Sequence, residues 1–503
     1  MKSSPRASRC AIRSALALAG LSASAFVAVG CHEINFTPDL PTGEITIYDD
    51  LFAVSAPTPE KVVAVGYWGA VYVSDDAGNT WKKGETGTRQ ILYGVSMADA
   101  KRGWAVGQSG MILRTEDGGL TWTRQPNNKV AEDTHLFAVQ ALDANTAWAV
   151  GEWGGRLFTD DGGKSWQDRS LTIDQLHPQF VWLSPPEQDK VRNGEKVYED
   201  VGLTDIYCLP NGKNCWIIGE FGYIFHSDNA GQTWERAAIQ QDISVPPIRL
   251  GYNEIEITKE HAESLREFAK KIIDLPHLNV AIEPVASAAE LAAFGKEDDP
   301  TPLFEILEAR QQAISAVLEE AGLLSDRIRK RGSPPWDYED FLDSDPEFLR
   351  RYLAGRKADE PGIAVTIAQN PYLFSVRFAD PNEGYIAGLG GVVLVSHDGG
   401  HNWVYRDTGR KQAIFSLFPV NGKVIAVGEK GFVRVSSDRG ETWIAPKKGF
   451  PNIFTFMRDI WFAPGGKSGY IVGERGNVLH TDDSGQNWKS VLPPAEHRSA
   501  AGG

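Results

Sequence analysis

The 503-residue sequence is poor in several features, and each shortage excludes a class of protein. Four cysteines are too few for a disulfide-built scaffold. Lys and Arg number 51 against 66 Asp and Glu, so the formal charge is −15, which argues against nucleic acid as a partner. Beyond residue 30 no apolar run is long enough to span a membrane. The ten histidines show no paired spacing with Cys or Glu, so we expect no metal site and no cofactor.

Glycine and tryptophan, by contrast, are plentiful, with 51 and 15 residues. Many glycines together with many aromatic residues favour short strands joined by tight turns over helix bundles. Hydrophobic residues make up 42% of the chain, which is enough to bury cores and excludes a disordered protein.

The first 30 residues are typical of a secretion signal. The four charges before residue 31 are basic and lie before residue 14, and an uncharged, apolar stretch follows from Ser14 to Gly30. The stretch ends Val27-Ala28-Val29-Gly30-Cys31, which resembles a bacterial lipobox, where a lipid is attached to the cysteine. We therefore expect lipid on Cys31, with an ordinary secretory signal as the alternative. By analogy with enterobacterial sorting, His32 in place of Asp favours the periplasmic side of the outer membrane.

One phrase, Ser/Thr-x-Asp-x-Gly-x-Thr-Trp, recurs with small variations through the chain. Its copies end at Trp81, Trp122, Trp166, Trp234, Trp403, Trp443 and Trp488. The unit is 40 to 45 residues long, with extra residues before the fourth copy and many more before the fifth. Each copy follows short apolar runs such as 136–139 and 148–151, so each unit is expected to hold four short strands. This period is that of a β-propeller blade, and the sequence predicts an all-β, seven-bladed propeller.

The repeated phrase is the Asp-box found in several propeller families. Its Asp can accept hydrogen bonds from the backbone of its own turn, its Gly permits positive φ, and its Trp brings about 150–250 Å² of surface to the core. We expect these residues to hold turns rather than to catalyse a reaction or bind metal. They are Asp76, Asp117, Asp161, Asn229, Asp398, Asp438 and Asp483.

Seven Asp-box units behind a lipobox resemble the photosystem II stability and assembly factor family, over residues 49–240 and 371–492. The resemblance implies a non-enzymatic propeller on the lumenal or periplasmic side of a membrane, which helps a membrane-associated protein complex to assemble. It leaves the client open. The alternative is a carbohydrate-active enzyme, because sialidases and other glycoside hydrolases also carry Asp-boxes. Such enzymes need an acid facing a nucleophile or base across a pocket, and the early aromatic-Arg-Ile-Pro segment of sialidases is missing here.

The repeats and the extra residues divide the chain. We expect a signal peptide at 1–30, a linker at 31–48, blades one to four at 49–240, an α+β insertion at 241–370, blades five to seven at 371–495 and a tail at 496–503.

Strand order places both long connectors, near 169–202 and 241–371, at the end of the blades that carries the Gly-x-x-Gly turns. Exposed aromatic residues beside carboxylates at that end are typical of a partner-binding face, although solvated turn residues are the simpler alternative. The residues of this predicted face are Tyr67, Trp68, Glu152, Trp153, Glu220, Phe221, Glu429 and Glu474.

The larger insertion shows helical apolar stripes over 258–275 and 302–322, and a further short helix is expected from 345 to 355. Apolar runs at 253–257 and 279–282 are expected to be strands. This order of elements resembles the periplasmic OmpA-like domain, which binds peptidoglycan.

In that resemblance, Arg310 takes the position of the family's ligand-binding arginine. Leu303 and the segment 283–287 depart from the family's Asn and Asp, so peptidoglycan is possible but is not the expected partner. Otherwise Arg310 is expected to be a solvated helix charge near Glu305 or Glu308.

Cys208 and Cys215 are the thiols that remain once Cys10 leaves with the signal and Cys31 carries lipid. They flank Pro210-Asn211-Gly212, a strong turn signal, between the first two strands of blade four. A hairpin there places the two cysteines opposite each other, and an oxidising compartment lets the bond persist. We predict a disulfide, with two buried free thiols as the alternative.

Substituting Cys31→Ser should release the protein from membranes or leave its precursor uncleaved, because each buried CH₂ of a lipid chain contributes about 0.8 kcal/mol to anchoring. Membrane fractionation and the mass of the mature chain measure this. A variant that fractionates and migrates like the wild type would show that the lipobox interpretation is wrong.

Overall fold

The computed structural model describes residues 45, 49–127, 134–177, 179–180, 183–241, 243–295, 301–330, 357–358, 361–369 and 371–491. The predicted signal peptide, Cys31, the predicted helix at 345–355 and the tail at 496–503 lie outside these described residues. Lipid anchoring therefore stays a prediction. Among the described residues, no helix is long and apolar enough to cross a membrane.

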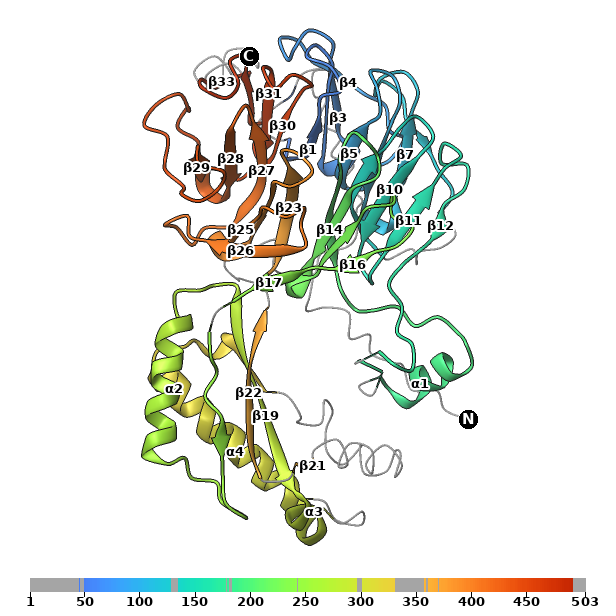
Figure 1. The fold of residues 1–503 in the computed structure, drawn as a ribbon. Coiled ribbons are helices and arrows are strands. Elements are labelled where there is room, and N and C mark those ends of the chain that lie inside the picture. Colours follow the sequence, from blue (N-terminus) through green and yellow to red (C-terminus); the bar gives the residue numbers. More distant parts are fainter. Residues whose placement is uncertain are drawn as a thin grey trace, which may run out of the picture. The chain divides into compact units, whose positions relative to one another are not determined.

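Seven small antiparallel sheets, the blades, follow one another along the chain (Figure 1). Blade one contains β1 (Leu51–Ser55), β2 (Val62–Gly66), β3 (Val71–Ser74) and β4 (Lys82–Lys83). Blade two contains β5 (Leu92–Met97), β6 (Gly103–Gly107), β7 (Ile112–Thr115) and β8 (Thr123–Arg124). Blade three contains β9 (Leu136–Ala141), β10 (Ala147–Gly151), β11 (Arg156–Thr159) and β12 (Gln167–Asp168). Blade four contains β13 (Leu203–Cys208), β14 (Cys215–Gly219), β15 (Ile224–Ser227) and β16 (Glu235–Arg236).

The last three blades vary this plan. Blade five contains β23 (Leu373–Phe378), β24 (Gly384–Gly388), β25 (Val393–Ser396) and β26 (Asn402–Arg406), and β17 (Ala238–Gln240) adds a parallel fifth strand. Blade six contains β27 (Ile414–Val420), β28 (Lys423–Gly428) and β29 (Val433–Ser436). Blade seven contains β30 (Met457–Phe462), β31 (Gly469–Gly473), β32 (Val478–Thr481) and β33 (Lys489–Ser490). The predicted seven-bladed propeller is confirmed, but the expectation of four strands in every blade is wrong for blades five and six.

The cores lie between successive blades. The second strands, such as β2, are buried at every residue except for the half-buried Lys423 of β28. They form apolar runs because both of their faces pack against a neighbouring blade. Blade one closes the ring on blade seven: Leu51 and Tyr72 share a buried cluster with Tyr470 and Val472.

The Asp-box turns join the third and fourth strands of the blades. In blade one, Asp76 Oδ1 accepts the Thr80 N–H at 2.8 Å, the Ser74 hydroxyl oxygen accepts the Gly78 N–H at 2.8 Å, and the Trp81 ring N–H donates to the Gly78 carbonyl at 3.0 Å. Hydrogen bonds from Ser165 lower the pKa of the equivalent Asp161 to about 2. Each of these acids is therefore occupied in its own turn.

The predicted disulfide is confirmed. Cys208 and Cys215 are paired residues of β13 and β14, with Cα atoms 4.1 Å apart, and they form a covalent bond.

The larger insertion has a sheet of its own, with the strand order β18-β22-β19-β20, and helices pack on this sheet. Its elements are β18 (Ile248–Arg249), α2 (Lys259–Ile272), β19 (Leu278–Ser287), α3 (Ala288–Phe294), α4 (Thr301–Glu320), η6 (Ser325–Arg327), β20 (Ile328–Lys330), β21 (Lys357–Ala358) and β22 (Gly362–Gln369). The smaller connector holds α1 (Pro185–Arg192).

Two expectations about the insertion are wrong. Residues 253–257 form no strand, because Asn253 adopts φ 58° and donates its N–H to Glu290. Arg310 is not a solvated charge beside Glu305 or Glu308. Its guanidinium is fully buried, lies 2.6 Å from Glu290 Oε1 and donates to the Glu254 carbonyl at 2.9 Å. The ion pair thus fastens the irregular segment to the helices, and the guanidinium is engaged inside the protein.

Replacing both Cys208 and Cys215 by Ser should lower the free energy of unfolding by about 2–3 kcal/mol, because the closed loop is short and the unfolded chain gains little entropy. Urea unfolding of the oxidised wild type and the double variant measures the difference. A variant as stable as the wild type would show that the bond constrains nothing in the unfolded chain.

Candidate functional site

Four-residue turns join the second and third strands of each blade, and we call the end of the propeller that carries them the η-turn end. The first three residues of five of these turns form 3₁₀ helices: η2 (Tyr67–Gly69), η3 (Gln108–Gly110), η5 (Glu220–Gly222), η7 (Leu389–Gly391) and η8 (Glu429–Gly431). Because the Asp-boxes follow the third strands, they lie at the opposite end. Both long connectors run from a fourth strand to the next first strand, so each starts and finishes at the η-turn end.

The first residue of several turns is a carboxylate with a structural partner. Glu152 accepts the N–H of His135 at 2.8 Å, and Glu220 accepts the N–H of Gly202 at 2.9 Å. Glu429 accepts the Ala413 N–H at 3.4 Å in the same way. Each donor lies directly before the first strand of its own blade, so these side chains fasten the turn to that strand. The repeated Glu after the glycine of strand two is a sequence signal for this role that our sequence analysis missed.

The second residue of each turn is held in the left-handed region, at φ 57° in Trp68 and 56° in Trp153. These two indoles are 75% and 49% exposed. A bulky residue at positive φ costs on the order of 1–3 kcal/mol, which glycine avoids, as at Gly390 in blade five. An exposed indole removes little surface from water to offset this backbone strain, so folding alone does not explain the two tryptophans.

The other aromatic residues of the predicted face are less exposed. Tyr67 and Phe221 are half-buried, and the Tyr67 ring lies 5.1 Å from that of Phe52. The predicted set therefore divides into exposed tips, packed rings and structural carboxylates.

Aromatic rings line the centre of the propeller toward the η-turn end. They are the second residues of first strands: Phe52, Tyr93, Phe137, Phe374 and Phe415. Neighbouring rings stack edge to face or tilted, with centroids 5.6 Å apart for Phe52 and Tyr93 and 5.5 Å apart for Phe374 and Phe415. Burial raises the pKa of Tyr93 to about 12, so its hydroxyl stays protonated.

Blade seven places an arginine in this aromatic layer. The Arg458 guanidinium lies 4.7 Å from the centre of the Phe415 ring and 5.4 Å from that of Phe52, and it donates to Glu474 Oε1 at 2.7 Å. Its side chain is partly exposed. A cation held between aromatic faces and anchored by a carboxylate is a preorganised contact for a polar group of a ligand.

A cavity of about 120 Å³ lies at the axis, lined by residues from all seven first strands. It contains an ion pair between Arg377 and Asp205 at 2.6 Å, and Asp459, which accepts the N–H of Val54 at 3.0 Å and the hydroxyl of Ser416 at 2.8 Å. Burial raises the pKa of Asp459 to about 6.

This cavity does not suit glycoside hydrolysis. Its volume is below the roughly 300–1,000 Å³ of small-molecule sites, and both carboxylates are engaged by backbone N–H groups and side chains. Across the residues that the structure covers, no group of three or more His, Cys, Asp and Glu side chains could hold a metal ion.

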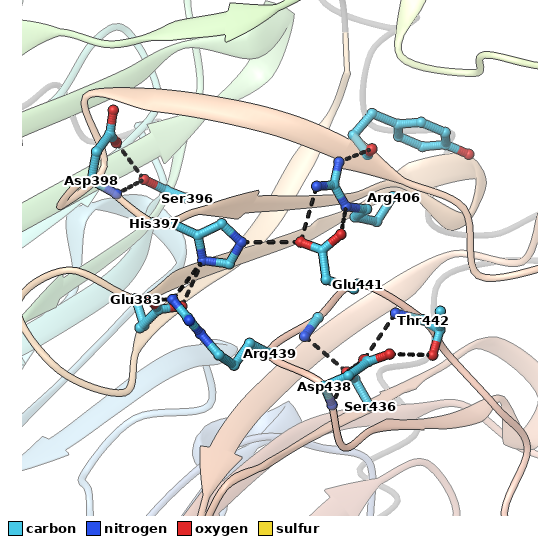
Figure 2. A network of polar contacts seen from close by, with 12 residues as sticks. Glu383, Ser396, His397, Asp398, Arg406, Ser436, Asp438, Arg439, Glu441 and Thr442 are labelled. Carbon is cyan, nitrogen blue, oxygen red and sulfur yellow. Dashed lines mark hydrogen bonds and ion pairs between the residues drawn. The ribbon is translucent and has the colours of Figure 1, made fainter.

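The Asp-box end carries a polar network where blades five and six meet (Figure 2). His397 lies 2.7 Å from Glu383 and 3.1 Å from Glu441, and Arg406 lies 3.0 Å from Glu441. Burial opposes the charged imidazole, but hydrogen bonds to Glu441 and Glu383 outweigh it and raise the pKa of His397. Glu383 pairs with His397 and Arg439, and Glu441 pairs with His397 and Arg406, which suits a seam between blades better than a binding site.

Comparisons with known proteins agree with the repeat analysis. The family model described as photosynthesis system II assembly factor YCF48 matches residues 81–179, from the end of blade one to the connector after blade three. The predicted resemblance to this family is confirmed over that segment. No curated protein matches the chain.

The solved structures that are similar to this chain include two of YCF48 and one WD40 propeller. YCF48 bound to D1 peptide is 16% identical, with 88% of this chain and 98% of that chain covered and a TM-score of 0.46. YCF48 from Cyanidioschyzon merolae is 16% identical, with 79% and 96% covered and a TM-score of 0.35. The WD40 β-propeller domain of Doa1 is 9% identical, with 87% and 95% covered and a TM-score of 0.43.

The wild-type protein should lose stability as pH rises and Asp459 ionises in its buried site, and the Asp459→Asn variant, which cannot ionise there, should not show this loss. The pKa is about 6 in the folded chain and about 3.9 in an unfolded one, so the folded state binds more protons between these values. Wild-type stability should therefore fall, relative to the variant, as pH rises from about 4 to about 6, by at most about 3 kcal/mol. Urea unfolding of both proteins across this range measures the difference, and a constant difference would contradict the assignment.

Proposed function

Because the chain resembles the photosystem II assembly factors over residues 81–179, we propose that it is a non-catalytic assembly or stability factor for a membrane-associated protein complex. Its η-turn end docks a polypeptide segment of that complex. Cys31 carries the lipid that holds the protein on the periplasmic side of the outer membrane, so that the propeller works beside its client.

The observation that carries this proposal is the pair of exposed indoles, Trp68 and Trp153, on strained turn tips. They belong to blades one and three, so two turns of one end present the same chemistry. Tryptophan is enriched among the few interface residues that supply most of the binding energy. A partner that covers these rings would remove their apolar surface from water, which favours binding.

The axial layer supports a polypeptide as the bound class. Stacked rings accept apolar side chains, and Arg458 with its Glu474 anchor offers donors for a carboxylate or a backbone carbonyl. A ligand of mixed apolar and polar groups matches this surface. Hydrolysis of a glycan would need an acid and a base that face each other, and the two axial carboxylates, Asp205 and Asp459, are engaged by backbone N–H groups.

The double variant Trp68→Ala/Trp153→Ala should capture the client from native membranes in mild detergent at least about tenfold less well than the wild type, since two hot-spot rings are lost. Its thermal unfolding temperature should stay equal or rise, because the exposed rings contribute little to the core. Quantitative pull-down with mass spectrometry measures capture.

Leu120→Ala is the matched control, since Leu120 is an exposed apolar residue in the Asp-box turn at the opposite end of blade two. It should capture the client as the wild type does. Equal capture by all three proteins, or turnover of a glycan without any protein partner, would overturn the proposal.

A further inference from the structure

The outer side of blade six differs from that of every other blade. In the other blades, the third residue after the Asp-box tryptophan donates its N–H to the carbonyl of the first residue of the third strand. The Gly84 N–H donates to the Val71 carbonyl at 2.8 Å, and the Val491 N–H donates to the Val478 carbonyl at 2.9 Å. Gln125, Arg169, Ala237 and Arg406 take the same place in the other four blades. In blade six this residue is Pro446, which has no N–H to donate.

The proline leaves β29 without a full neighbour. A single residue, Ile444, pairs with Val435, and the chain then departs. Among the described residues, no backbone N–H reaches the Val433 carbonyl, which instead accepts the side chain of Arg434 at 2.9 Å. The first three residues of β29 are half-buried. By comparison, β11 has two half-buried residues, β32 has one, and β3, β7, β15 and β25 are buried at every residue.

The free part of the edge is Val433, which lies between Val435, paired with Ile444, and Gly431, whose N–H donates to the Thr455 carbonyl at 2.9 Å. Because outward-facing residues alternate along a strand and Val435 faces outward, the Val433 N–H and C=O face the same side. Ile444 beside it is 66% exposed. Lys447 and Lys448, which follow the proline, are exposed as well.

We propose that the outer edge of β29 binds an extended segment of a partner polypeptide, which adds the strand that Pro446 prevents this chain from supplying. The segment pairs with Val433, places an apolar side chain on Ile444 and carries a carboxylate for the two lysines. This edge site is separate from the turn tips Trp68 and Trp153 and does not depend on them.

A second copy of this chain fits the edge poorly. Edge-to-edge pairing about a two-fold axis would bring Lys447 and Lys448 of both copies toward each other, and like charges that face each other destabilise a strand pair. Lysine and proline beside a short edge are the usual protection against such pairing. An acidic segment removes the repulsion.

The Arg434 side chain occupies the acceptor of this edge when no segment is bound. Its Nη1 occupies the Val433 carbonyl, while its Nε donates to the Thr408 carbonyl of blade five at 3.1 Å. A bound segment has to displace the first contact and can leave the second in place. Removing the guanidinium should therefore strengthen binding.

The probe is the peptide Glu-Val-Thr-Val-Thr-Val-Glu with blocked ends and a fluorescent label, titrated into the full chain and followed by anisotropy. Exchange of amide hydrogens in residues 431–437, read by mass spectrometry, locates the bound peptide. We expect saturable binding with slower exchange in this segment, and at least about tenfold weaker binding when alternate peptide nitrogens are methylated, because the strand hydrogen bonds are then lost.

Two variants decide the outcome. Pro446→Thr restores the missing N–H, so its own strand should cover β29 and weaken peptide binding, while Arg434→Gln should strengthen it. Sedimentation of the wild type shows whether it self-associates. The proposal is overturned if neither the wild type nor Arg434→Gln binds the peptide, if methylation or Pro446→Thr changes nothing, or if the edge is covered by a dimer that Pro446→Thr abolishes.

Discussion

Closure of the ring is the constraint on which the rest of this structure depends. Blade seven has to pack on blade one, and Asp459 contributes by accepting the N–H of Val54 from the neighbouring first strand. Asp205 does the same for Val376 between blades four and five, on either side of the large insertion. Carboxylates at the axis thus give directional contacts between neighbouring blades, and burial of their charge opposes this gain.

The closed ring divides its two ends between different tasks. At the Asp-box end, acids are engaged by their own turns or by cationic neighbours such as those around His397. At the η-turn end, carboxylates such as Glu152 accept N–H groups that precede the first strands and so hold the turns in place. The turn tips carry Trp68 and Trp153, whose positive φ angles lower the stability of the fold. A rigid frame that carries strained, exposed aromatic tips is suited to binding.

The sequence was sufficient for the fold because the Asp-box recurs with a blade's period, and for the disulfide because Pro210-Asn211-Gly212 closes a two-strand hairpin. It was insufficient where contacts join distant residues. The burial of Arg310 depends on Glu290 across two elements of the insertion. The open edge of blade six had a readable signal, Pro446 three residues after a repeated tryptophan, but its meaning required the hydrogen bonds of the other blades.

The central claim is that a partner docks on the η-turn end, and site-specific photo-crosslinking tests it most directly. A photoreactive phenylalanine derivative would replace Trp153 in one protein and Leu120, at the Asp-box end, in another, and both would be irradiated in native membranes. We expect a single membrane-associated protein to be crosslinked from position 153 and not from position 120. Equal crosslinking from both positions, or crosslinking from position 120 alone, would contradict the account.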